Sequence, residues 1–166
     1  MDLDIAAGTV NGTLQAVTWN PNGLSNALDP WSRLLRPDDK DRERPHMVFV
    51  MEHKLADRVR SNNNSAWRRD KYFHYHTNKH VAVAVRKDLV QQDMIKREQV
   101  PEALKEHAIQ LTVQIPNLPP THMIGVYLAH QDKQTLEGVL QQWIQAIRKA
   151  NPSNTIHVGG TLTQQI

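Results

Sequence analysis

Short apolar runs recur along the chain and predict β-strands. Residues 47–51 (MVFVM) and 123–128 (MIGVYL) are almost wholly apolar, as in strands that are buried on both faces. Other runs alternate or are rich in β-branched residues, and these lie at 14–19, 80–85, 107–115 and 155–158. We therefore expect a protein that is mostly β-sheet.

Two segments have helical spacing instead. Between residues 133 and 150, apolar positions three and four apart form one stripe, made of Leu136, Val139, Leu140, Trp143, Ile144 and Ile147. Asp132 is a suitable N-cap for this helix, and Asn151-Pro152 is a suitable end. A weaker helical pattern covers residues 25–35. The fold class expected from these elements is α/β, mostly β-sheet with two main helices.

Length and composition narrow the class of protein. The 166 residues suffice for about one domain, so we expect an N-terminal tail at 1–13 and a single domain at 14–166. The absence of cysteine excludes a disulfide scaffold, thiolate zinc sites and a cysteine nucleophile. No apolar run approaches the ~20 residues of a membrane span, and the N-terminus resembles neither a signal nor a transit peptide. We expect an intracellular protein; the nucleus and an organelle such as the mitochondrion both stay open.

The charge is concentrated in one segment. Residues 54–87 hold nine basic and two acidic residues, a charge of +7 in a chain whose net charge is +3. A basic segment of this kind favours contact with RNA or DNA, although a solvated basic loop would have the same composition. The candidate nucleic-acid contacts are Lys54, Arg58, Arg60, Arg68, Arg69, Lys71 and Lys79.

Aromatic and histidine side chains are interleaved with these bases. Tyr72, Phe73 and Tyr75 could stack on nucleobases or pack as an ordinary strand. His74 and His76 would share one strand face, but a zinc site without cysteine needs three or four converging histidines or carboxylates. A place on the basic surface is therefore favoured over a zinc site, while stacking on bases and ordinary packing in a strand both stay open.

Four motifs follow the expected strands, and a fifth element is the run from His80 to Leu89. The motifs are Trp19-Asn20-Pro21-Asn22-Gly23-Leu24, Met51-Glu52-His53-Lys54, Gly125-Val126-Tyr127 and Gly159-Gly160-Thr161-Leu162-Thr163. A carboxylate at the end of a buried strand can hold Mg²⁺, but on this motif alone a pair between Glu52 and Lys54 is the favoured interpretation.

In this order the motifs resemble the endonuclease/exonuclease/phosphatase superfamily, and most closely the apurinic-type endonuclease domains of non-LTR retrotransposons. The resemblance runs from Leu14 to Thr163. It implies a sandwich of two sheets between helices and Mg²⁺-assisted hydrolysis of phosphodiesters. It also implies that Glu52 holds the metal, Asn20 organises the site and Tyr127 contacts phosphate, with Asn22 as an allowed variant.

The sequence departs from the family at the residues that carry the chemistry. Thr161 stands where the family has the aspartate that activates water, and Thr163 stands where it has asparagine. Loss of a positioned general base costs ~10²–10⁴ in rate. The resemblance also implies that the chain, ending at Ile166, lacks the family's last third with its Asp-His pair. We therefore expect an incomplete sandwich without cofactor, in which Glu52 is a vestigial metal ligand and Mg²⁺ matters only if activity remains.

Three functions are compatible with these features. The favoured one is a pseudoenzyme derived from a retroelement-like endonuclease and reused as a structural or interaction subunit of a larger assembly, such as a ribonucleoprotein, with other chains covering the truncated sheet. One alternative is a Mg²⁺-dependent endonuclease completed in trans by a partner chain. The other is a basic module that binds nucleic acid.

Overall fold

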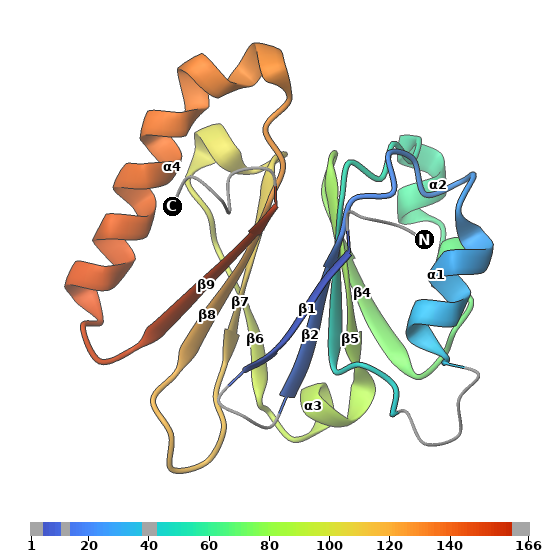
Figure 1. Cartoon of the computed structure of the whole chain (residues 1–166), viewed down its shortest axis with the longest axis horizontal. Helices are drawn as coiled ribbons and strands as arrows, with labels where there is room; N and C mark the ends of the chain where they lie inside the picture. Colours follow the sequence, from blue (N-terminus) through green and yellow to red (C-terminus); the bar gives the residue numbers. More distant parts are fainter. Residues whose placement is uncertain (1–4, 11–13, 38–42, 161–166) are drawn as a thin grey trace.

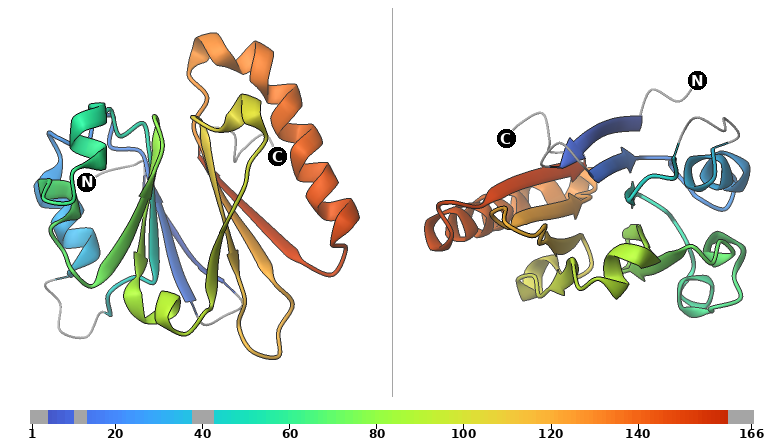
Figure 2. Two further views of the ribbon diagram at one scale, coloured as in Figure 1. Left: turned by 180° about the vertical axis from the view of Figure 1, so that it is seen from behind. Right: turned by 90° about the horizontal axis from the view of Figure 1, so that it is seen from below.

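Two β-sheets pack face to face, and helices cover their outer faces (Figure 1). The computed structural model describes residues 5–10, 14–37 and 43–160. Figure 2 shows the same layers from behind and from below, with α4 outside one sheet and α1 and α2 outside the other. The expected α/β architecture, mostly sheet with two main helices, is confirmed.

The first sheet has the strand order β1-β2-β3-β5-β4. Its strands are β1 (Ile5–Val10), β2 (Leu14–Trp19), β3 (Met47–Met51), β4 (Phe73–Thr77) and β5 (Val81–Arg86). Only β2 and β3 are parallel neighbours in this sheet. The second sheet has the order β6-β7-β8-β9, made of β6 (Ile95–Glu98), β7 (Ala108–Val113), β8 (Thr121–Val126) and β9 (Thr155–Gly160).

The helices are α1 (Leu28–Leu35), α2 (Asp57–Ser61), α3 (Lys87–Gln91) and α4 (His130–Ala150), with short 3-10 turns at Ala66–Arg68 and Glu102–Leu104. Helix α4 is the crossover between the parallel strands β8 and β9. It begins at His130 after Ala129, so Asp132 lies inside the first turn and the predicted N-cap is wrong. None of the described helices is long and apolar enough to cross a membrane.

Alternating side chains divide the sandwich into three apolar layers. In β5 the valines Val81, Val83 and Val85 face the core between the sheets, while Ala82 and Ala84 face the layer that contains Trp31 of α1. The two sheets approach closely, because a Cβ atom on Gly125 would lie 2.4 Å from the Phe49 ring. Leu140 and Ile144 of α4 bury the outer face of the second sheet.

Strand β1 corrects the expected N-terminal tail. It lies within residues 1–13 and pairs antiparallel with β2 from Ile5↔Trp19 to Val10↔Leu14. The sheet therefore begins before residue 14. Asn11-Gly12, which separates β1 from β2 in the sequence, is a hairpin signal that the apolar pattern did not reveal. Strand β6 was also missed, since this edge strand has no fully buried residue.

Candidate functional site

The candidate site lies where the ends of strands from both sheets meet. Strands β2 and β3 are parallel, so the residues that follow them, Asn20 and Glu52, reach the same edge of the sheet. The Asn20 amide Nδ2 donates to Glu52 Oε1 at 3.3 Å. Tyr127 follows β8 of the facing sheet; burial raises its pKa, and so do the charge of Glu52 and a hydrogen bond to that carboxylate. Three residues far apart in the sequence are thus brought together.

The loops that carry these residues have an unusual backbone. Five non-glycine residues of the described chain have positive φ, and three of them are here: Asn22 at 52°, Glu52 at 57° and Lys54 at 54°. Backbone hydrogen bonds hold the two loops together, from the Gly23 amide to the Glu52 carbonyl at 3.0 Å and from the Leu24 amide to the His53 carbonyl at 2.8 Å. Left-handed backbone in residues with a side chain costs about 1–3 kcal/mol each and persists where the surroundings enforce it.

The Lys54 ammonium pairs with the polar groups of this site. Its Nζ donates to Asn22 Oδ1 at 2.6 Å and lies 3.4 Å from Glu52 Oε2. Asn20 Oδ1 in turn accepts from the Asn22 amide at 2.9 Å. Both Glu52 oxygens therefore have a donor from the protein itself.

Neither a family model nor a curated protein matches this chain. Solved structures match it in fold. A truncated Caenorhabditis elegans TDP2 matches with a TM-score of 0.56 and 13% identity, over 86% of this chain and 57% of that one. A D. rerio TDP2 humanized by 14 mutations matches with a TM-score of 0.58 and 15% identity, over 90% of this chain and 62% of that one.

The endonuclease domain of TRAS1, a telomere-specific non-LTR retrotransposon, matches with a TM-score of 0.53 and 13% identity, over 90% of this chain and 60% of that one. The chain has an endonuclease/exonuclease/phosphatase-type fold. It spans about three fifths of the length of these structures. At such low identity the likeness concerns the fold alone.

The resemblance of the motifs implies a magnesium ion at Glu52, and the described residues do not fit a preformed site for it. No group of three or more histidine, aspartate or glutamate side chains in residues 5–10, 14–37 and 43–160 is placed to hold a metal. The single carboxylate is engaged by Asn20 and by the Lys54 ammonium. Thr161 and Thr163, which replace the family's acid and amide, lie outside the described residues.

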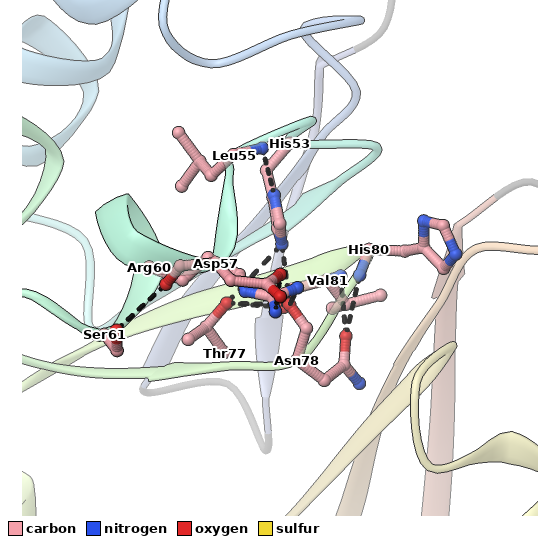
Figure 3. A network of polar contacts seen from close by, with 9 residues as sticks. All are labelled: His53, Leu55, Asp57, Arg60, Ser61, Thr77, Asn78, His80 and Val81. Atoms are coloured by element: carbon pink, nitrogen blue, oxygen red, sulfur yellow. Dashed lines mark hydrogen bonds and ion pairs between the residues drawn. The ribbon is translucent and has the colours of Figure 1, made fainter.

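A buried histidine network, which the sequence reasoning missed, supports the Glu52 loop (Figure 3). His53 is fully buried; its Nε2 lies 2.8 Å from the Asn78 carbonyl oxygen, and its Nδ1 accepts from the Leu55 amide at 2.8 Å. Burial lowers the His53 pKa to about 4, so the ring is neutral. Because Nδ1 accepts from the Leu55 amide, the ring proton is on Nε2. Asn78 also donates to the Ala108 carbonyl at 2.9 Å and so connects the two sheets. The signal in the sequence was a histidine directly after Glu52, at the end of the wholly apolar run 47–51.

Two further rings extend the site toward the second sheet. His80 stacks on His107 with centroids 4.9 Å apart and lies 5.9 Å from the Tyr127 ring. Figure 3 shows the His80 ring pointing away from His53. Burial lowers the His80 pKa, and the neighbouring His107 lowers it further.

The seven predicted nucleic-acid contacts fall into two groups. Arg60 pairs with Asp57 at 2.5 Å and donates to the Asn78 carbonyl at 3.2 Å, while Arg68 donates to Asn63 and to the Arg60 carbonyl. These two arginines, like Lys54, are held by the protein. The other four side chains are exposed, and they are Arg58, Arg69, Lys71 and Lys79.

The expected pair of histidines on β4 shares a strand face but forms no zinc site within the described ranges. Burial and the charge of Arg97 lower the His76 pKa to about 4.

Proposed function

We propose that this chain is a nuclease-like domain without catalytic activity that works as an interaction subunit of a larger assembly, such as a ribonucleoprotein. The observation that carries the proposal is the closed Glu52 site, in which Lys54 and Asn20 occupy the two carboxylate oxygens. Phosphodiester hydrolysis is accelerated ~10²–10⁴-fold by a positioned base that activates water. The hydroxyl of Thr161, which stands at that position of the motif, holds its proton too tightly for this role.

The retained geometry supports an inherited scaffold. Three strained backbone positions persist in Asn22, Glu52 and Lys54 although the acid of the family motif is replaced. Partner chains have edges on which to add: among the described strands β9 pairs only with β8, and β4 pairs only with β5. Edge strands bind other chains through their backbone groups.

A second candidate is an endonuclease completed in trans, which the contact of Asn20 and Tyr127 with Glu52 favours. In that case a partner chain supplies the acid and histidine that the motifs here lack. This candidate requires Mg²⁺ and cleavage that depends on Glu52.

Two measurements on the full chain test the proposal. Native affinity purification at moderate salt should recover a stoichiometric multi-subunit complex. The purified complex is incubated with Mg²⁺ and labelled abasic duplex, single-stranded DNA and RNA. It should cleave these substrates no more than a complex that carries Glu52→Ala. Cleavage that is lost in Glu52→Ala would refute inactivity, and a single small partner carrying an Asp-His pair would favour the enzyme completed in trans.

A further inference from the structure

An exposed tyrosine lies at the opposite end of the first sheet from Glu52. Tyr72 precedes β4 and is 63% exposed, the most exposed large hydrophobic residue among those described. Phe73 pairs with Arg86, and Val85 pairs with Met47 at the start of β3, whereas Glu52 follows the end of β3. The length of β3 separates the two places by roughly 17 Å, at about 3.3 Å a residue. Tyr72 is therefore no part of the Glu52 site.

Tyr72 is held in one arrangement with Arg44. The Arg44 guanidinium lies over the ring, 3.8 Å from its centroid, and pairs with Asp70 at 2.7 Å. The other Asp70 oxygen accepts from the Tyr72 amide at 3.0 Å, and the Tyr72 carbonyl accepts from the Lys87 amide at 2.8 Å. Because the ring and the guanidinium are already ordered, a ligand that stacks on them loses little further conformational freedom.

A hollow lies on each side of this pair, and both hollows are lined by Arg44, Lys71 and Tyr72. The one toward α1 has a volume of about 400 Å³, with Trp31 and Trp67 among its lining residues. The one toward α3 has a volume of about 520 Å³. Each lies in the range of pockets that hold small organic groups.

The charged groups around the hollows leave an excess of cations. Of the four carboxylates, Asp70 pairs with Arg44 and Asp88 pairs with Arg86, which leaves Asp29 and Glu43. Four cations have no salt bridge among the described residues, and they are Arg36, Arg69, Lys71 and Lys87.

We propose that this Tyr72–Arg44 platform binds single-stranded nucleic acid, with a base stacked on the pair and phosphates held by Arg69, Lys71 and Lys87. Aromatic rings and guanidinium planes stack on unpaired bases, and neighbouring cations neutralise the backbone. A duplex keeps its bases stacked inside, so a single exposed ring selects for a single strand. This inference goes beyond the proposed interaction subunit and does not depend on the loss of catalysis.

Fluorescence anisotropy with labelled single strands of about 10 nucleotides, in RNA and DNA form, tests the platform. Tyr72→Ala should weaken binding by about 5- to 150-fold, and Tyr72→Phe should retain it. Lys71→Gln and Arg69→Gln should each lower the slope of log affinity against log salt by about 0.7. Lys149→Gln, an exposed lysine in the last turn of α4 on the second sheet, is the matched control and should bind as the wild type does.

A second variant tests the platform even if Tyr72→Ala fails to fold. Tyr72→Trp places an indole on the platform, and its fluorescence above the wild-type background should be quenched by the oligonucleotide. Equal affinity of Tyr72→Ala and wild type, equal affinity for a duplex of the same sequence, or equal competition by polyglutamate would each overturn the proposal. The nuclease assay depends on Glu52 and this one on Tyr72, so either proposal can fail alone.

Discussion

At the end of the first sheet where β3 finishes, Glu52, Asn22 and Lys54 satisfy one another; at the end where β3 begins, Tyr72 and its cations face solvent. The first end has a strained backbone, and its polar groups pair with one another. The second has an ordered aromatic ring and cations without partners among the described residues. The strand ends that carry the left-handed loops thus pair their polar groups within the protein, whereas the opposite end presents its aromatic and charged groups to solvent.

Low pH should destabilise the protein through His53, which lies at the Glu52 end of the first sheet. Burial lowers the His53 pKa to about 4 from the usual 6.5, so the unfolded chain binds a proton that the folded chain excludes. The contribution of His53 to stability is complete above pH 6.5 and is lost as the pH falls toward 4, with uptake of about one proton on unfolding. Urea denaturation across this range should show the decline, and His53→Gln should make it less steep by about one proton although it lowers stability at neutral pH. His76, whose pKa is also about 4, keeps its own share of the decline. An unchanged pH slope in His53→Gln would contradict the buried neutral ring.

The contact between the sheets behind Tyr127 should tolerate no added methyl group. Gly125→Ala places Cβ 2.4 Å from the Phe49 ring and should lower the free energy of unfolding by about 1–3 kcal/mol. The matched control is Gly138→Ala on α4, where nothing lies within 4 Å, and it should raise stability by up to about 1 kcal/mol. Chemical denaturation measures both, and equal effects would mean that the sheets are not in contact at Gly125.

The sequence predicted the parts of this fold that burial decides. The bounds of β2 and β3 match the expected runs, because their apolar residues pack against the core or α1 layers. The predicted apolar stripe of α4 is the face that packs against the second sheet. Strand β1 was missed because its place depends on pairing with β2 more than on its own apolar content.

The sequence predicted which residues form the site, but it did not predict how their side chains pair. The motifs named Asn20, Glu52 and Tyr127, which the fold brings together. The contacts of the Lys54 side chain depend on the left-handed backbone at Asn22, Glu52 and Lys54. No pattern of residues in the sequence predicts this backbone. Composition likewise counted Arg60 as a free cation, although its side chain reaches Asp57 and the Asn78 carbonyl.

Lys54 separates backbone strain from side-chain pairing. Lys54→Ala keeps the positive φ and loses the contacts with Asn22 and Glu52, whereas Lys54→Gly loses the same contacts and relieves the strain. The glycine variant should therefore be more stable than the alanine variant by about 1 kcal/mol. Chemical denaturation of the two variants gives this difference directly. If alanine were as stable as glycine, the Glu52 loop would not be strained.

The smallest expected effect is the coupling between Arg44 and Tyr72. A guanidinium over an exposed ring contributes about 0.5–1 kcal/mol. A double-mutant cycle of Arg44→Gln and Tyr72→Ala, measured by chemical denaturation, should return a coupling energy of this size. Arg44→Gln also breaks the pair with Asp70, but that loss occurs in both backgrounds of the cycle and cancels. A coupling of zero would mean that the ring and the guanidinium do not hold each other, and the Tyr72 end would then be no more ordered than a solvated basic loop.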